Sequence, residues 1–267
     1  MLEVTRLTKK FFPGTINEIV ALKGLDLRLE EGDFLTVIGS NGAGKTTLLN
    51  TIAGTLIPTS GRVFIAGEDV TELPEHSRAQ MIGRVFQEPG QGTAAGMTVA
   101  QNLVLASRKG GRGLRLGVTE ERKERFRDEL AKLGLGLEGR LGERVTHLSG
   151  GQRQGLAVLM ATMIMPSLLL LDEHTASLDP KNARKIMDIT ERLVKAKGLT
   201  TIMVTHDMGQ AIELGDRLAM LHRGDIVFQA REEEKEELTV EDLVASFSRG
   251  AGEGLADDEL LLTMEGG

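Results

Sequence analysis

Short apolar runs alternate with segments of helical spacing along most of the chain. Gly32–Gly39 (GDFLTVIG) and Thr200–His206 (TTIMVTH) have the length and composition of strands that are buried on both faces. Gly61–Gly67 and Ile82–Gln87 are further predicted strands, and Lys45–Gly54 changes to the spacing of a helix. Strands that alternate with helices predict an α/β fold around a parallel sheet.

A long helical stretch separates the early strands from the later ones. Met97–Met165 has mostly helical spacing and ends before Pro166, so we expect an inserted helical subdomain at about residues 93–165. The glycine- and arginine-rich segment Arg108–Gly117 interrupts it. We interpret this segment as a solvated loop, with contact to lipid headgroups or a membrane partner as the alternative.

The run Leu168–Asp179 (LLLLDEHTASLD) combines four leucines with two adjacent acids. The leucines predict a buried strand, and Pro180 stands at a favoured early position of the next helix. Burying even one unpaired carboxylate is costly. Asp172 or Glu173 must therefore meet a positive charge or take part in chemistry.

Charge is unevenly distributed between the body of the chain and its end. The 267 residues carry a net charge of -7, but residues 231–267 hold 12 acids and 3 bases, which leaves +2 for residues 1–230. The body thus lacks the basic excess typical of nonspecific nucleic-acid binding. We interpret residues 231–267 as an acidic C-terminal extension that packs on a partner subunit or stays mobile. Thr239–Phe247 begins with a capping-box pattern and predicts a helix.

Composition excludes several other classes of protein. The chain has no cysteine, so it has neither a disulfide framework nor a cysteine-ligated zinc site. No apolar run is long enough to span a membrane, and the first ten residues lack the apolar core of a signal peptide. We expect a cytoplasmic protein, which leaves room for attachment to a membrane partner.

The segment Gly39–Thr46 (GSNGAGKT) fits the phosphate-binding pattern G-x-x-x-x-G-K-[ST] between a predicted strand and a predicted helix. Its glycines allow backbone amides to point at phosphate oxygens, and the helix N-terminus favours anions. We expect Lys45 to reach the β- and γ-phosphates and Thr46 to bind Mg²⁺. The candidate nucleotide-binding residues of this loop are Gly39, Ser40, Asn41, Gly42, Ala43, Gly44, Lys45, Thr46 and Thr47.

The two acids after the leucine strand fit this loop. A phosphate loop of this type needs a second Mg²⁺ anchor at the end of a neighbouring buried strand, and Asp172 is that candidate. Glu173 stands one residue later, where the strand ends. We predict that it activates or orients the attacking water.

A second glycine-rich segment narrows the class of protein. Leu148–Gln154 (LSGGQRQ) opens another helix with a serine and two glycines. With this motif, residues 1–230 resemble the ATP-binding cassette (ABC) family of transport ATPases, whose signature is LSGGQ. The resemblance implies a P-loop NTPase core with a mostly parallel sheet, an N-terminal antiparallel β region and an inserted helical subdomain.

The resemblance also assigns roles to residues. In the family, the signature of one subunit closes over the ATP of the other in a head-to-tail dimer, which places the nucleotide contacts at Ser149, Gly150, Gly151 and Gln152. Gln87 matches the loop glutamine that contacts Mg²⁺ and water, and His206 matches the histidine that contacts the γ-phosphate. Ser177–Pro180 matches the loop that communicates between the two sites. Phe11 is the candidate for stacking on adenine, with Phe12 as its rival and core packing as the alternative.

One residue departs from the family pattern. The family commonly has proline after the Asp-Glu pair, whereas this chain has His174, which reaches a dimer interface or simply occupies the turn. The run DEHTASLDP resembles a subgroup of importer ATPases related to amino-acid importers. The implied protein is a peripheral ATPase on the cytoplasmic face of the membrane. It would work as a homodimer with transmembrane permease subunits, a solute-binding protein, ATP and Mg²⁺, and without nucleic acid.

Three rival classes fit less well. ABC ATPases of DNA repair separate the phosphate loop from the signature by long coiled coils or zinc modules, but here Lys45 and Ser149 are only 104 residues apart. Translation-associated ABC proteins usually carry two cassettes, and this chain has one. A binding module without catalysis would be expected to lose Glu173 or His206, and both are present.

Overall fold

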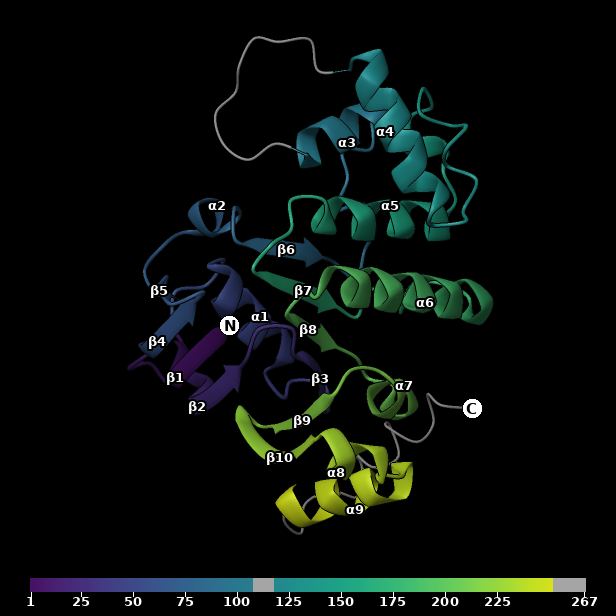
Figure 1. Ribbon diagram of the computed structural model, residues 1–267. Coiled ribbons are helices and arrows are strands. Elements are labelled where there is room, and N and C mark those ends of the chain that lie inside the picture. The colour runs from purple at the N-terminus through teal and green to yellow at the C-terminus, as the bar shows by residue number, and fades with distance from the viewer. Residues whose placement is uncertain (108–117, 252–267) are drawn as a thin grey trace. The chain divides into compact units, whose positions relative to one another are not determined.

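The computed structural model of the protein describes residues 1–107 and 118–251 (Figure 1). The expected solvated loop at Arg108–Gly117 therefore lies outside the described residues. The chain forms two compact units. One consists of Met1–Met81 and Leu199–Gly267, and the other is Ile82–Gly198.

The first unit holds the antiparallel strands, part of the mostly parallel sheet, and short helices. Its strands are β1 (Leu2–Phe11), β2 (Ile19–Leu29), β3 (Phe34–Ile38), β4 (Ser60–Ile65), β5 (Glu68–Asp69), β8 (Thr201–Val204), β9 (Arg217–His222) and β10 (Asp225–Arg231). Its helices are α1 (Lys45–Ala53), α2 (Glu75–Arg78), α7 (Met208–Glu213), α8 (Glu232–Glu236) and α9 (Val240–Ala251).

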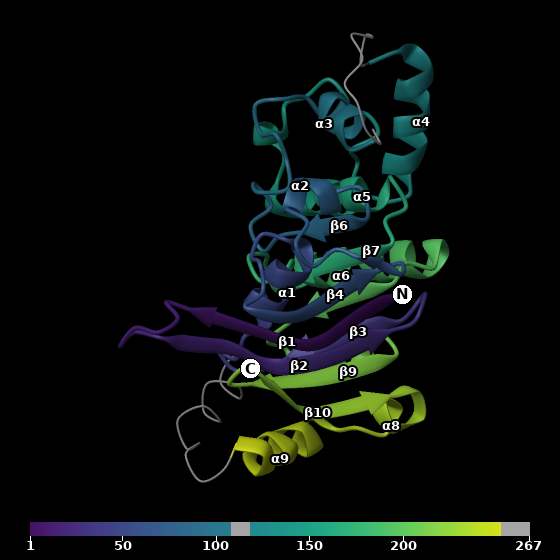
Figure 2. The same ribbon diagram turned by 90° about the vertical axis from the view of Figure 1, so that its left-hand side faces the viewer.

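The antiparallel sheet has the strand order β2-β1-β4-β5, and its long β1–β2 pair is seen in Figure 2. In β2, the buried Leu25, Leu27 and Leu29 alternate with the exposed Asp26 and Arg28. Such a period of two puts one face of the strand on the core and the other in solvent. The N-terminal antiparallel region implied by the resemblance is thereby confirmed.

The mostly parallel strands of this unit carry the phosphate loop. Strand β3 pairs in parallel with both β8 and β9, and β10 is antiparallel to β9. Every residue of β3, β8 and β9 is buried. The expectation of doubly buried strands at Gly32–Gly39 and Thr200–His206 is thus confirmed.

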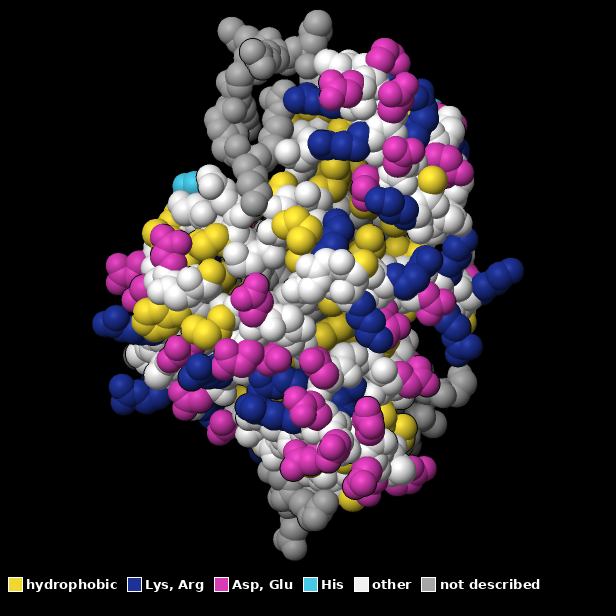
Figure 3. Space-filling model, in the orientation of Figure 1, with side chains coloured by type: hydrophobic (Ala, Val, Ile, Leu, Met, Phe, Trp, Pro, Cys, Tyr) yellow, Lys and Arg dark blue, Asp and Glu magenta, His cyan; other side chains and the backbone are white. Residues whose placement is uncertain are grey.

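The C-terminal helices pack on the core of the same unit. Leu243 of α9 is completely buried in a cluster with Ile38, Met208, Ala211 and Met220. The capping box is present, because the Thr239 hydroxyl accepts a hydrogen bond from the backbone N–H of Asp242 at 3.2 Å. Acidic side chains gather over α8 and α9 (Figure 3). Helix α9 therefore packs on the core of its own unit through Leu243, and contact of this acidic extension with a partner subunit stays a prediction.

The second unit contains two parallel strands and a set of helices. These elements are β6 (Ile82–Val85), α3 (Val99–Ala106), α4 (Glu120–Ala131), a 3₁₀ turn (Val145–His147), α5 (Gly150–Thr162), β7 (Leu168–Asp172) and α6 (Pro180–Lys197). The four leucines of β7 are buried, as predicted. Helices α5 and α6 lie side by side (Figure 1). Among the residues that the structure describes, no helix is long and apolar enough to cross a membrane.

Candidate nucleotide-binding and catalytic site

The phosphate-binding loop connects β3 to α1 and depends on glycine at two close approaches. A Cβ atom on Gly39 would lie 2.2 Å from the carbonyl oxygen of Leu221. One on Gly44, whose φ is 108°, would lie 2.7 Å from the carbonyl oxygen of Ala21. Only glycine fits at these positions, so the motif spacing reflects the local packing as well as the need to expose backbone amides.

Lys45 is the buried cation of the loop. Its Nζ donates hydrogen bonds to the carbonyl oxygens of Gly39 at 2.6 Å and Ser40 at 3.2 Å. Lys45 is only 6% exposed, whereas the next residue, Thr46, is exposed at the start of α1. The ammonium is therefore held within the turn of its own loop, at the N-terminus of a helix where an anion is favoured.

The turn between β9 and β10 supports the loop from the side. Gly224 donates its backbone N–H to the Ala43 carbonyl oxygen at 2.8 Å and accepts from the Lys23 N–H at 2.9 Å. Its φ is 85°, and a Cβ there would lie 2.7 Å from the Ala21 carbonyl oxygen. Sequence reasoning missed this residue. The available signal was a glycine between two runs of strand character.

Arg78 fixes the far end of α1. Its guanidinium is completely buried and donates to the carbonyl oxygens of Thr51 and Ile52 at 2.8 and 2.7 Å. These carbonyls belong to the last turn of α1, where the Thr51 carbonyl oxygen also accepts from the Gly54 N–H at 3.3 Å. Burial lowers the pKa of Arg78 from its usual value. The helix that presents the loop is thus held at both ends.

His206 follows β8 at the sheet edge where the phosphate loop begins. Val204 is in register with Val37, and the Thr205 N–H donates to the Val37 carbonyl oxygen at 3.1 Å. Because β3 and β8 are parallel, their carboxyl ends meet at one edge. The structure therefore brings His206 and the residues after Ile38 to the same edge of the same unit.

Phe11 and Phe12 occupy different environments at the end of β1. Phe11 pairs with Ile19 and is partly buried, with the Lys9 ammonium 5.4 Å from its ring centre. Phe12 is 65% exposed and has a φ of 51°. The role of Phe11 toward adenine stays a prediction.

Asp172 lies at the end of β7 beside a cation that sequence reasoning missed. The guanidinium of Arg84 approaches its carboxylate at 3.6 Å, and both side chains are largely buried. The Arg84 guanidinium also lies 4.6 Å from the ring centre of Phe86. Arg84 gives the acid a positive neighbour within its own unit. Its signal in the sequence was a lone basic residue inside the predicted strand Ile82–Gln87.

Gln87 and Glu173 occupy equivalent places just beyond the carboxyl ends of the paired strands β6 and β7. Val85 is in register with Leu171, and each candidate residue follows two positions later. Glu173 has a φ of 42°, the left-handed region that is uncommon outside glycine. The Ser177 hydroxyl donates to the Gln87 carbonyl oxygen at 3.3 Å, which joins the predicted communicating loop to the predicted glutamine loop.

His174 lies inside the unit. It is completely buried, and its Nε2 lies 3.1 Å from the Thr190 hydroxyl of α6. Burial lowers its pKa to about 4, so the ring is neutral near pH 7. Of the two alternatives for His174, the structure supports the turn and excludes the dimer interface, because no part of the residue is at the surface. It occupies the turn as a packed residue.

The signature segment forms the start of α5. The Ser149 hydroxyl accepts from the Gln152 N–H at 3.3 Å, and the Gln152 side chain accepts from the Ser149 N–H at 3.1 Å. Gln152 also bonds Arg140 and the Leu135 carbonyl oxygen, so its amide holds protein partners in this structure. An added Cβ on Gly150 would touch Leu178 at 3.3 Å, which explains part of the glycine requirement.

The donors proposed for Mg²⁺ have the right chemistry. Mg²⁺ prefers oxygen ligands and uses one or two carboxylates together with substrate phosphates. The hydroxyl of Thr46, the amide oxygen of Gln87 and the carboxylate of Asp172 are such oxygens. Over the described ranges, no group of three or more histidine, aspartate or glutamate side chains forms a metal site of the all-protein kind.

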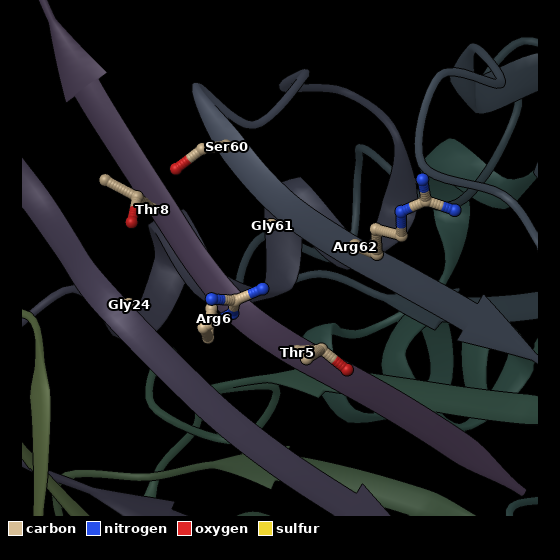
Figure 4. A pocket seen from close by; sticks show the side chains of 7 residues that line it. All are labelled: Thr5, Arg6, Thr8, Gly24, Ser60, Gly61 and Arg62. Atoms are coloured by element: carbon tan, nitrogen blue, oxygen red, sulfur yellow. The ribbon is translucent and has the colours of Figure 1, made fainter.

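A separate cleft lies on the antiparallel sheet (Figure 4). Its volume is about 580 Å³, and none of the predicted site residues contributes to it. Its lining is formed by Thr5, Arg6, Thr8, Gly24, Ser60, Gly61 and Arg62. This cleft is distinct from the phosphate loop.

Comparison with known proteins identifies the class to which this fold and loop belong. The family model described as ABC transporter matches residues 22–176. The tyrosine transport ATP-binding protein of Clostridioides difficile is 42% identical over 92% of this chain and 98% of its own. The phosphonates import ATP-binding protein of Alcaligenes faecalis is 36% identical over 85% of this chain and 82% of its own.

A solved structure agrees in fold. The dimeric post-hydrolysis state of the ATP-binding cassette MJ0796, bound to ADP and phosphate, covers 86% of this chain and 98% of its own. The TM-score is 0.72 and the identity 30%. The fold and loop are those of a P-loop ATPase cassette. The chain belongs to the ABC transporter family and is an ATP-binding subunit with ATPase activity.

Proposed function

We propose that this chain powers the import of a small organic solute, of the amino-acid type, from the cytoplasmic face of a membrane. The observation that carries the proposal is the 42% identity, over nearly the whole of both chains, to a protein named for tyrosine transport. The relative named for phosphonate import supports an importer more generally. The solute itself is recognised by other chains, because an ATP-binding subunit has no part in binding it.

In this proposal, the phosphate loop binds ATP and holds it in place. Lys45 exchanges its bonds to the loop carbonyls of Gly39 and Ser40 for the β- and γ-phosphates. The N-terminus of α1 contributes backbone N–H groups and a favourable potential for anions. Phe11 stacks on the adenine ring. Binding is mostly positioning and electrostatics, which are the main sources of catalysis in phosphoryl transfer.

Hydrolysis requires a group that handles the attacking water. Glu173 accepts the proton of that water. His206 contacts the γ-phosphate, and Gln87 contacts the water. Thr46, Gln87 and Asp172 would hold Mg²⁺, whose positive charge would offset the negative charge of the phosphates. The left-handed backbone of Glu173, just beyond the buried end of β7, supports this assignment because such strain is typical of functional turns.

The signature segment acts on the ATP of a second copy. Ser149, Gly150, Gly151 and Gln152 open a helix of 13 residues, whose N-terminus is suited to a phosphate that its own chain does not supply. Two copies then bind two ATP molecules head to tail. A dimeric relative of the same fold supports this arrangement.

A reconstituted transporter tests the proposal. Tagged protein carrying Glu173→Gln is used to purify its complex from detergent-solubilised membranes with Mg²⁺ and ATP, and Lys45→Ala serves as the matched control. We expect two transmembrane subunits with the first variant, and a solute-binding protein encoded with them. In proteoliposomes the wild-type complex should hydrolyse ATP faster when that protein carries tyrosine or a related amino acid.

Two results would contradict the proposal in different ways. Stimulation by an unrelated solute would leave the importer intact and remove the amino-acid assignment. Transport of solute in the opposite direction, or a complex that contains nucleic acid and no transmembrane subunit, would exclude an importer.

A further inference from the structure

His174 makes a contact that neither the motif pattern nor the proposed mechanism assigns. It directly follows Glu173, and its side chain is completely buried. Its Nε2 atom lies 3.1 Å from the hydroxyl oxygen of Thr190, near the middle of α6. The turn after β7 is therefore joined to the body of that helix by a side chain next to the proposed catalytic carboxylate.

The hydrogen bonds around Thr190 define which nitrogen carries the proton. The Thr190 hydroxyl donates its single hydrogen to the Ile186 carbonyl oxygen at 2.8 Å. It can only accept from His174, so Nε2 is the protonated nitrogen. The other nitrogen, Nδ1, is buried without a hydrogen-bond partner among the residues that the structure describes. A half-satisfied polar ring costs more than an apolar side chain of the same size, so its presence calls for a reason.

Glu173 lies between two neighbours that are both held in place. On one side, Asp172 faces the guanidinium of Arg84 at 3.6 Å. On the other side, His174 is bonded to α6. Glu173 itself has a φ of 42°, and its carbonyl oxygen accepts from the Ala176 N–H at 3.0 Å. A strained residue of this kind persists only where its surroundings over-determine the backbone.

We propose that His174 is a positioning residue, whose hydrogen bond to Thr190 holds the turn so that the Glu173 carboxylate stays directed at the attacking water. The inference rests on the proposed role of Glu173 as the group that handles water. It adds a requirement that the motif does not contain, namely a donor at residue 174 and an acceptor at residue 190. Small displacements of a catalytic group are enough to slow a reaction strongly.

Three substitutions separate the hydrogen bond from simple packing. His174→Leu and Thr190→Val each remove one partner while keeping similar volume. His174→Gln keeps a donor, because its amide nitrogen reaches about as far as Nε2. Thr162→Val is the matched control. Thr162 is also a buried threonine of this unit, and its hydroxyl donates within its own helix to the Leu159 carbonyl oxygen at 3.0 Å.

The measurement is steady-state ATP hydrolysis by the full chain, with kcat and KM for ATP determined separately and with thermal unfolding recorded for each variant. We expect His174→Leu and Thr190→Val to lower kcat by roughly tenfold or more with KM within about twofold of wild type. His174→Gln should recover most of kcat. Thr162→Val should unfold earlier than wild type and keep its kcat.

Two results would overturn the positioning role of His174. If His174→Gln is as slow as His174→Leu, or if Thr190→Val keeps the wild-type kcat, the positioning role is overturned. Glu173→Gln, measured in parallel, distinguishes the proposed role of Glu173 from the proposed role of His174. Normal turnover in Glu173→Gln would remove the proposed function of that residue. Slow turnover there together with normal turnover in His174→Leu would remove only the inference about His174.

Discussion

The Lys45 ammonium donates to the carbonyl oxygen of Gly39 at 2.6 Å, so the cation of the phosphate loop is bonded to the residue that opens the loop. Gly39 in turn tolerates no side chain, because a Cβ would meet the Leu221 carbonyl oxygen at 2.2 Å. The charge and the turn that holds it are therefore parts of one local structure. Losing either should affect nucleotide binding.

Lys45→Ala should severely weaken productive binding of ATP, because it removes the ammonium that faces the phosphates. We expect the loss in Mg²⁺-dependent turnover to exceed roughly 10²-fold, as for other preorganised charges that stabilise phosphoryl transfer. Titration with a fluorescent ATP analogue and phosphate release measure the two effects. Tight binding with normal turnover would show that Gly39–Thr46 is not the phosphate loop.

Ser149→Arg should leave ATP binding by the single chain largely intact and abolish dimer closure. The substitution puts bulk and a positive charge at the N-cap of α5, where the signature of one chain is proposed to meet the γ-phosphate of the other. Sedimentation with ATP in the Glu173→Gln background measures closure. Normal closure and normal hydrolysis by the Ser149→Arg chain would exclude this role in trans.

Mixing two defective chains gives a sharper form of the same prediction. In a heterodimer of Ser149→Arg with Lys45→Ala, one composite site is wholly native and the other carries both lesions. Some hydrolysis should return on mixing, once cross-linking shows that heterodimers form. A parallel mixture of Ser149→Arg with a Ser149→Arg, Lys45→Ala double variant is the control, because it contains no native composite site and should stay inactive.

Lys235 should matter for stability even though it lies outside the catalytic motifs. It is nearly buried, and its Nζ donates to the carbonyl oxygens of Leu214 at 2.8 Å and Gly215 at 2.9 Å, beyond the end of α7. Burial lowers its pKa from the usual value. Lys235→Met should reduce the free energy of unfolding by about 2 kcal/mol, because buried carbonyls lose their donor.

Urea denaturation measures this loss, with Lys195→Met as the control. Lys195 is exposed and forms only a surface ion pair with Glu191, so its replacement should change stability by less than about 1 kcal/mol. A Lys235→Met protein as stable as wild type would mean that the carbonyls gain other partners.

The buried His174 should make stability depend on pH. Its pKa is about 4 in the folded chain, against an ordinary value of 6.5, because burial disfavours the charged ring. The unfolded chain therefore binds the proton first as the pH falls. The contribution of the neutral ring is complete above pH 6.5 and is lost progressively toward pH 4.

Between about pH 7.5 and about pH 5.5, wild type should lose roughly 1 kcal/mol more of its unfolding free energy than His174→Gln. Urea denaturation of both proteins without nucleotide or Mg²⁺ measures the difference. Equal losses in the two proteins would show that His174 has the same pKa in the folded and unfolded chains.

Much of the fold could be predicted because its strongest signals are local. The four leucines before Asp172, the strand before Gly39 and the capping box at Thr239 are each found where the sequence places them. A buried strand needs a continuous apolar run, and a capped helix needs particular residues at its start, so both leave a mark within a few positions.

The residues that hold the candidate site in place could not be predicted in the same way, because their contacts join segments that are distant in the sequence. Arg84 meets Asp172 across 88 positions of the sequence, and Gly224 contacts the loop of Ala43 across 181. The side chain of His174 gave no sign that it would be buried against Thr190. Nor did the acidic tail indicate that Leu243 would fill the core, since its charges are more numerous than its apolar positions.

Hydrolysis as proposed depends most directly on Glu173, and steady-state ATP hydrolysis by Glu173→Gln tests the role of this residue. The substitution keeps the shape of the side chain and removes the carboxylate that accepts a proton from water. We expect turnover to fall by roughly 10²–10⁴-fold while ATP is still bound and the dimer stays closed in sedimentation. Turnover near that of wild type would contradict the account and would assign the handling of water to another residue, with His206 the first to be examined.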